Sequence, residues 1–397
     1  MAKSLKEYSV TDFEKITDFS SSITFCNGLE SGLDLIKTEF SLDKNVKKVF
    51  WTGKNLCLAS HEDLIYRLTE YGFELLTIAP FSNLKEVFLY QLGGQDILCV
   101  YANGFIYFLD SGIDAIPCKD FKKILSLDGR IYGYTDNCIY FNKLCTDNIS
   151  TYRSLFNLSI SIADEYGKIL DVLRDGKDLI IISTNAILRL VTAFNEEDFC
   201  LKKVQSIYGE LEESSIQKVK DKVVYLSKDR VVTIGEKTFN SRLLKDAIVV
   251  DKAKHGGHLY VLPVSISGEN YFYVLDTLSL SEQFVKSTNL LTDGLYAVNE
   301  LNGRVYLLGE VSETSSSNWQ SVPMDFGVQS QKVLIGIKVS GSPLKVTVKA
   351  NNQSFSFISN GRKKILPVGI KSDLFTVNIS GDKNRVSVTE ITFYYNE

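Results

Sequence analysis

Residues 92–109 read LGGQDILCVYANGFIYFL, and this stretch decides the fold. Gly93 and Gly94 supply a turn, DILCVY forms an apolar run, Asn103-Gly104 supplies a second turn, and FIYFL forms a second apolar run. Short apolar runs joined by glycine-containing turns are typical of antiparallel strands. The stretch therefore predicts a β-hairpin whose two faces are both apolar and must both be buried against other parts of the chain.

The same pattern of turn, apolar strand, polar turn and apolar strand recurs along most of the chain. It is anchored at positions 53, 94, 129, 176, 221, 257 and 303. The mean spacing is about 42 residues, which is the length of a four-stranded propeller blade. Stacking such units radially buries both faces of every sheet. Seven copies predict a seven-bladed β-propeller; six or eight blades, or a series of hairpins in a solenoid or two sandwiches, are the alternatives.

Each copy is preceded by another apolar run, for example Val46–Trp51 and Leu84–Tyr90, which we expect to be the innermost strand of its blade. The seventh copy is the weakest, because the chain becomes polar over Ser312–Asn318. A propeller must close, so we expect residues 1–45 to supply the missing strand. Either Ser22–Glu30 or Asp34–Phe40 has a suitable pattern, although Ser9–Ile16 and Leu29–Thr38 also fit short helices.

The pattern changes at Trp319. Short alternating strands follow, and the run LKVTVKA at residues 344–350 places apolar and polar side chains on opposite faces. Six such strands predict a small C-terminal β-sandwich. The expected fold class is all-β, with a propeller over residues 46–318 and a sandwich over residues 319–397.

Composition narrows the function classes. The net charge of −4 gives no electrostatic reason to bind nucleic acid, and the sequence lacks an apolar run long enough for a membrane helix. Its polar start predicts no signal peptide and assembly in the cytoplasm. Seven cysteines without a CxxC pair and three histidines predict free thiols and no metal. We identify no GxSxG nucleophile elbow, phosphate loop or HExxH motif, and we expect no enzyme and no cofactor.

The segment that begins the sandwich carries a family resemblance. Asn318-Trp319-Gln320-Ser321, then Met324-Asp325-Phe326-Gly327, resembles a pattern in bacteriophage tail proteins, as do Phe375–Gly381 and Val388–Tyr395. Residues 18–29 are similar to the start of phage tail-nozzle and head-completion propellers. The chain departs from the larger nozzle proteins because it lacks their inserted domains.

The resemblance implies a structural role in a virion tail or neck. The implied partners are other virion proteins, such as a portal, adaptor, tail tube or nozzle. Copies would form a homo-oligomeric ring around the DNA exit path, with DNA passing nearby without specific binding. Trp319, Asp325, Phe326 and Gly327 are the predicted interface or domain-junction residues. A receptor- or glycan-binding adhesin, and a propeller glycosidase or lyase, are the alternatives.

Overall fold

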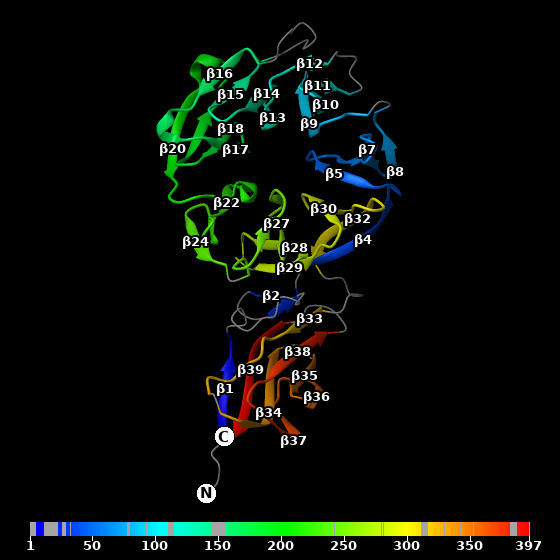
Figure 1. The fold of residues 1–397 in the computed structure, drawn as a ribbon, viewed down its shortest axis with the longest axis vertical. Coiled ribbons are helices and arrows are strands. Elements are labelled where there is room, and N and C mark those ends of the chain that lie inside the picture. Colours follow the sequence, from blue (N-terminus) through cyan, green and yellow to red (C-terminus); the bar gives the residue numbers. More distant parts are fainter. Residues whose placement is uncertain are drawn as a thin grey trace.

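The computed structural model describes residues 5–11, 23–25, 29–31, 33–77, 80–92, 94–109, 115–144, 156–241, 243–278, 280, 282–310, 317–328, 330–341, 344–351, 353–381 and 387–396. These residues form an all-β structure with seven sheets arranged as the blades of a propeller and two further sheets in a sandwich (Figure 1). The all-β fold class and the β-propeller are confirmed.

The first four blades follow the chain without interruption. In each, a short hairpin joins the first and second strands, and the four strands form an antiparallel meander. Their strands are β5 (Val46–Trp51), β6 (Leu56–Ser60), β7 (Ile65–Thr69) and β8 (Gly72–Leu75); β9 (Leu84–Leu92), β10 (Gln95–Ala102), β11 (Phe105–Phe108) and β12 (Ile116–Pro117); β13 (Lys123–Leu127), β14 (Arg130–Tyr134), β15 (Cys138–Phe141) and β16 (Leu158–Ser161); β17 (Ile169–Asp175), β18 (Asp178–Ser183), β19 (Ala186–Val191) and β20 (Cys200–Ser206).

The last three blades complete the ring, and the seventh takes its outer strand from the N-terminal part of the chain. Their strands are β21 (Gln217–Val219), β22 (Lys222–Leu226), β23 (Val231–Ile234) and β24 (Lys237–Asn240); β25 (Ile248–Val249), β26 (Lys254–Gly256), β27 (Leu259–Ile266), β28 (Glu269–Asp276) and β29 (Glu282–Lys286); β30 (Leu290–Asp293), β31 (Tyr296–Asn299), β32 (Arg304–Glu310) and β4 (Leu33–Ser41).

Strand β4 closes the propeller by pairing antiparallel with β32, with Lys37 opposite Tyr306. It covers most of Asp34–Phe40, so of the two predicted closing segments this is the one used, and the helix considered for Leu29–Thr38 is wrong. Residues 12–22, which include part of the other segment and of the resemblance at residues 18–29, lie outside the described residues, as do residues 26–28.

The seventh repeat is displaced from its predicted position. The turn between the first and second strands of blade 7 contains Gly294, whereas the predicted anchor Gly303 lies between its second and third strands. Both glycines have positive φ, +63° and +67°, so both turns carry the same sequence signal. The sequence pattern identified a true hairpin but placed it one strand too late.

Hydrophobic side chains fill the space between neighbouring blades. Seven of the eight apolar clusters of the described residues each join two consecutive blades, and the cluster between blades 2 and 3 contains Tyr90, Tyr101 and Phe121. Buried tyrosines also bridge blades through their hydroxyls: Tyr90 donates to the carbonyl of Gly129 at 3.0 Å and Tyr260 to that of Ser215 at 2.6 Å. Each of these two contacts gives a buried phenol the acceptor that it needs.

The sandwich is built from both ends of the chain. One sheet contains β2 (Ile23–Phe25), β3 (Leu29–Ser31), β39 (Ser387–Asn396), β34 (Lys332–Gly341) and β37 (Lys364–Ser372), with β1 (Lys6–Val10) also paired to β39; the other contains β33 (Ser317–Gln320), β38 (Thr376–Gly381), β35 (Lys345–Ala350) and β36 (Gln353–Ile358). The N-terminal residues therefore contribute strands to the sandwich as well as β4 to the propeller, which the sequence did not predict.

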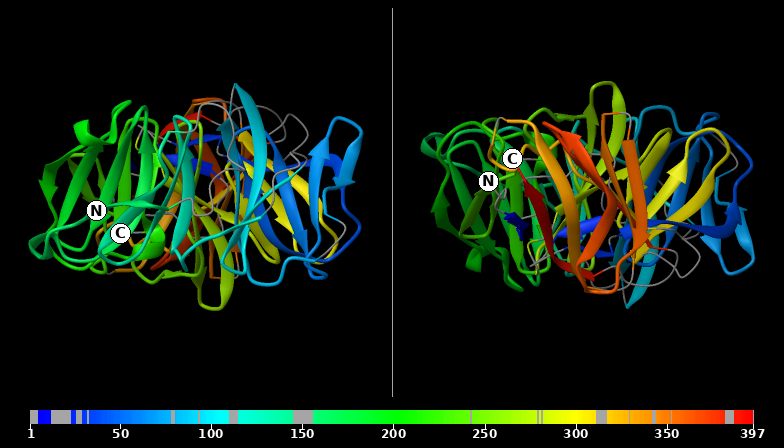
Figure 2. Two further views of the ribbon diagram at one scale, coloured as in Figure 1. Left: turned by 90° about the horizontal axis from the view of Figure 1, so that it is seen from above. Right: turned by 90° about the horizontal axis from the view of Figure 1, so that it is seen from below.

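The sandwich lies at the rim of the propeller, next to β29 and β4 (Figure 1). Seen along the long axis of the molecule, the sandwich strands lie within the outline of the disc (Figure 2). Neither flat face of the propeller is covered by the sandwich, so the central opening remains accessible.

Candidate functional site

The segment predicted as an interface or domain junction lies at the start of the sandwich. Trp319 belongs to β33 and its side chain is fully buried, and Phe326 is 4% exposed. The ring of Phe326 stacks on Phe375 with centroids 5.0 Å apart and an interplanar angle of 4°, and Tyr8 of β1 lies 5.2 Å from it. These two predicted residues therefore form the core of the sandwich and offer no surface to a partner.

Asp325 and Gly327 lie in an exposed turn on either side of Phe326. The Asp325 carboxylate accepts a hydrogen bond from the Gly327 N–H at 2.9 Å. Phe326 and Gly327 both have positive φ, +55° and +75°. Glycine adopts this backbone without strain, and the turn directs Phe326 inward. A contact role for Asp325 and Gly327 stays a prediction.

One edge of the sandwich exposes apolar side chains. Strands β36 and β37 are the last strands of the two sheets on this side, and each pairs with a single neighbour. Four large apolar residues are exposed on or next to them: Ile358 (65%), Ile365 (55%), Val368 (77%) and Leu374 (50%). A bulge opposite Leu334–Gly336 displaces the middle of β37, where Val368 lies. We call these four residues the apolar edge. Exposed apolar side chains gathered on one edge are typical of a protein-binding surface.

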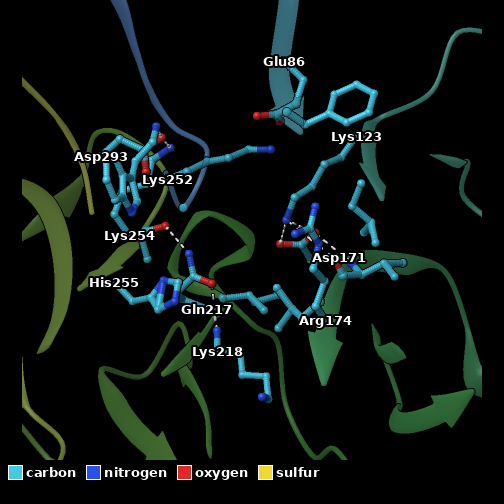
Figure 3. A pocket seen from close by; sticks show the side chains of 18 of the residues that line it. Glu86, Lys123, Asp171, Arg174, Gln217, Lys218, Lys252, Lys254, His255 and Asp293 are labelled. Atoms are coloured by element: carbon cyan, nitrogen blue, oxygen red, sulfur yellow. Dashed lines mark hydrogen bonds and ion pairs between the residues drawn. The ribbon is translucent and has the colours of Figure 1, made fainter. Parts of the chain in front are cut away.

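The described residues contain a second candidate site, a cavity of about 560 Å³ along the axis of the propeller (Figure 3). Its wall consists mainly of the innermost strands, β5, β9, β13, β17, β21 and β26, with the end of β30. Six basic and four acidic residues line it, namely Lys123, Arg174, Lys218, Lys220, Lys252 and Lys254 against Glu86, Asp171, Glu213 and Asp293. The channel is thus cationic although the whole chain carries a net charge of −4.

Ion pairs between neighbouring blades fix some of these charges. The Lys123 ammonium lies 3.0 Å from the Asp171 carboxylate, and Lys254 lies 3.4 Å from Asp293. Asp293 also accepts a hydrogen bond from the Trp51 N–H at 2.8 Å, which ties blade 7 to blade 1. Burial lowers the pKa of Lys254, but the carboxylates, Asp293 foremost, outweigh it and hold that pKa above its usual value. These pairs stabilise the ring.

Other charged groups of the channel have no such partner. Within the described residues, Arg174, Lys252 and Glu86 form no ion pair; Arg174 makes one long hydrogen bond, 3.5 Å, to the Ser126 hydroxyl. The Lys252 side chain extends into the cavity towards Glu86 (Figure 3). Burial lowers the pKa of Arg174 and raises the pKa of Glu86, so the surrounding protein disfavours charge of either sign.

The sequence interpretation did not identify the channel residues. His255 lies in β26, one residue before the Gly257-His258 turn, and its exposed ring lines the channel. The missed signal is the charged residue near the start of several innermost strands, such as Glu86 in β9 and Lys123 in β13. The described residues hold no cluster of metal-ligating side chains, and no helix among them could cross a bilayer.

Comparisons with known proteins give structural neighbours only. No protein-family model matches the chain, and no curated protein does. Two crystal structures of BBS1N in complex with ARL6DN, soaked with lead and with mercury, are each 10% identical with a TM-score of 0.46, over 70% of this chain and 98% of that one. BamB from Moraxella catarrhalis is 14% identical with a TM-score of 0.40, over 77% and 97%. The assignment of the fold to this chain rests on the strand pairing described above.

Proposed function

We propose that this protein is a structural component of a bacteriophage virion tail or neck, bound to its neighbours through the sandwich. Copies would form part of a ring around the DNA exit path. In each copy the sandwich would bind the neighbouring proteins, and the propeller would be attached to the sandwich at its rim. The proposal combines the resemblance at Asn318–Gly327 with the apolar edge, which is the observation that carries it.

The apolar edge supports a contact role for two reasons. Burying an exposed apolar side chain contributes roughly 25 cal/mol per Å², so four of them favour association. In addition, β36 and β37 each leave one side of a sheet unpaired, and such an edge can pair with another chain. On β37 the exposed Lys364, Pro367 and Lys371 restrict this pairing, so the apolar side chains rather than the backbone of β37 would make the contact.

The decisive experiment compares two exposed valines in the native particle. We expect Val368→Asp on the apolar edge to remove the protein from purified virions, because the partner would have to bury a charge. Val204→Asp places the same charge on the outermost strand of blade 4, at a residue that is 58% exposed, and should leave incorporation unchanged. The measurement is quantitative mass spectrometry of gradient-purified particles, with a fixed copy number per particle expected for the wild type. Absence of the wild-type chain from particles contradicts the virion role, and normal incorporation of Val368→Asp contradicts the role of the edge.

Exposed aromatic residues on the propeller favour a second candidate, a receptor- or glycan-binding adhesin. Tyr71 lies between β7 and β8, Phe194 between β19 and β20, and Tyr208 after β20; they are 92%, 74% and 90% exposed. Aromatic rings at loop tips suit ligand recognition. Binding of the isolated protein to host cells or a glycan array, lost in Tyr71→Ser or Tyr208→Ser, supports this role, and no binding in either assay argues against it.

A further inference from the structure

We propose that the propeller channel is a binding site for a small multivalent oxyanion, a molecule carrying two or more phosphate or carboxylate groups, held by Arg174 and Lys252. This site does not depend on the assembly role, because it lies on the propeller axis, whereas the apolar edge lies on the sandwich.

The first argument is the unbalanced charge. Lys123 and Lys254 are neutralised by Asp171 and Asp293 across neighbouring blades, but Arg174 and Lys252 have no carboxylate within ion-pair distance among the described residues. Both side chains are exposed in the channel, so a bound anion can pair with them without first breaking an ion pair. The fork of N–H donors on arginine matches the oxygens of phosphate and carboxylate.

The second argument is the size and access of the cavity. Its volume of about 560 Å³ falls within the roughly 300–1,000 Å³ of small-molecule sites. The sandwich lies at the rim of the disc, so it does not block the channel (Figure 1). Arg174 lies in the innermost strand β17, which fixes its backbone before a ligand arrives and lowers the entropy cost of binding, whereas Lys252 lies in the short segment before β26.

Glu86 limits which anions can bind. Its carboxylate lines the same cavity, near the Lys252 ammonium, and repels a negative ligand (Figure 3). A monovalent anion gains little against this repulsion, whereas a multivalent one can reach both Arg174 and Lys252. We therefore expect Glu86→Gln to strengthen binding, while variants that remove either cation weaken it.

The test is isothermal titration calorimetry of the full chain with sodium tripolyphosphate and, separately, with citrate at physiological ionic strength. We expect saturable binding of at least one, reduced about tenfold or more by Arg174→Gln and by Lys252→Gln. Tighter binding of tripolyphosphate identifies phosphate as the preferred group, and tighter binding of citrate identifies carboxylate. Lys202→Gln, on the outermost strand β20, is the matched control and should bind like the wild type.

Three results would overturn the proposal: no binding of either anion, an equal loss in Lys202→Gln, or affinity unchanged in both Arg174→Gln and Lys252→Gln. Thermal unfolding of each variant without ligand shows whether it is folded. If the two cation variants do not fold, Glu86→Gln decides alone, because tighter binding supports the site and unchanged or weaker binding refutes it.

Discussion

At the scale of single residues, Phe326 is the centre of the aromatic cluster in the sandwich, because its ring lies near four other aromatic rings. It lies 4.7 Å from Phe393, 5.0 Å from Phe375 and 5.2 Å from Tyr8. We expect Phe326→Ala to lower the free energy of unfolding of the sandwich by about 3–5 kcal/mol, through lost burial and the cavity left behind. Urea denaturation followed by the fluorescence of the buried Trp319 measures this change.

Asp325→Ala in the same turn is the control for Phe326→Ala. It removes the hydrogen bond to the Gly327 N–H in an exposed position, so it should cost about 1 kcal/mol or less. Equal effects of the two substitutions would mean that the turn, and not the aromatic cluster, dominates the stability of this segment.

The pKa of Glu86 is raised and that of Glu269 is lowered, so the two carboxyls should make opposite contributions to the pH dependence of stability. Burial raises the pKa of the Glu86 carboxyl above its ordinary value of 4.5, so the folded state binds the carboxyl proton more tightly than the unfolded state does. Protonated Glu86 therefore favours the folded state at low pH, and this contribution to stability is lost as the pH rises through the pKa of the folded state. We expect Glu86→Gln to raise the midpoint of thermal unfolding at pH 8 and to change it little near pH 4.5. A higher midpoint that is the same at both pH values would show that the charge of Glu86 is not the cause.

Glu269 is the matched comparison for Glu86. Hydrogen bonds from Tyr271 and Lys286 lower its pKa, so its contribution to stability is present above pH 4.5 and is lost as pH falls. Glu269→Gln should therefore lower the unfolding midpoint at pH 8, and the difference from the wild type should shrink as the pH falls below 4.5.

At the scale of elements, a buried glutamine of blade 6 joins β4 to that blade through two hydrogen bonds, beside the apolar contacts of Leu33 and Leu35. The Gln283 amide of β29, 3% exposed, accepts from the Leu33 N–H at 2.9 Å and donates to the Leu33 carbonyl at 2.7 Å. Gln283→Leu leaves both backbone groups without their partner, at a cost of about 1–3 kcal/mol for each. We expect faster amide hydrogen exchange along β4, with the other blades unchanged.

Lys286→Ala on the same strand is the control for Gln283→Leu. Lys286 is exposed and its ion pair with Glu269 is 3.1 Å long, so its loss should leave exchange in β4 unaffected. Faster exchange in both variants would indicate a general loosening of blade 6.

The repeat shows how far the sequence could predict these elements. Glycine turns and apolar runs are local, so six of the seven predicted anchors lie between the first and second strands of their blades, as Gly53 and Gly176 do. The seventh predicted anchor was misplaced because Gly294 and Gly303 lie in successive turns, and both turns contain a glycine with positive φ. Nothing local distinguishes β4 from a helix, because its strand character comes from pairing with β32.

At the scale of the whole molecule, each unit contains one of the two tryptophans, Trp51 in blade 1 and Trp319 in the sandwich. Removing residues 1–11 deletes β1, which pairs with β39 and brings Tyr8 to the aromatic cluster. We expect the Trp319 signal to unfold at lower temperature and the Trp51 signal to keep its midpoint, measured in Trp51→Phe and Trp319→Phe backgrounds. A matching fall in both midpoints would show that the two units unfold as one.

The candidate sites show what the sequence could not predict at this scale. Trp319 and Phe326 were predicted as interface or domain-junction residues, but both are buried in a core to which β1 and β39, from opposite ends of the chain, contribute. The cationic channel arises because charged residues of separate blades, Lys123, Arg174 and Lys252 among them, converge on one axis. Total charge cannot reveal such a local excess, since it averages over surfaces that face different surroundings.

The strand pairing also sets a constraint on synthesis. Thr38 of β4 donates a hydrogen bond to Val305, 267 residues later, and Ser9 of β1 is bonded to Thr392, 383 residues later. At about 5–20 residues per second a ribosome needs roughly 13 to 50 s to reach the partner of β4. During that time β4 has left the ribosome, but its pairing partner β32 has not yet been made. The propeller cannot close before β32 is translated, and the sandwich cannot close before β39 is, so until then nascent chains translated side by side on one messenger can exchange their first strands.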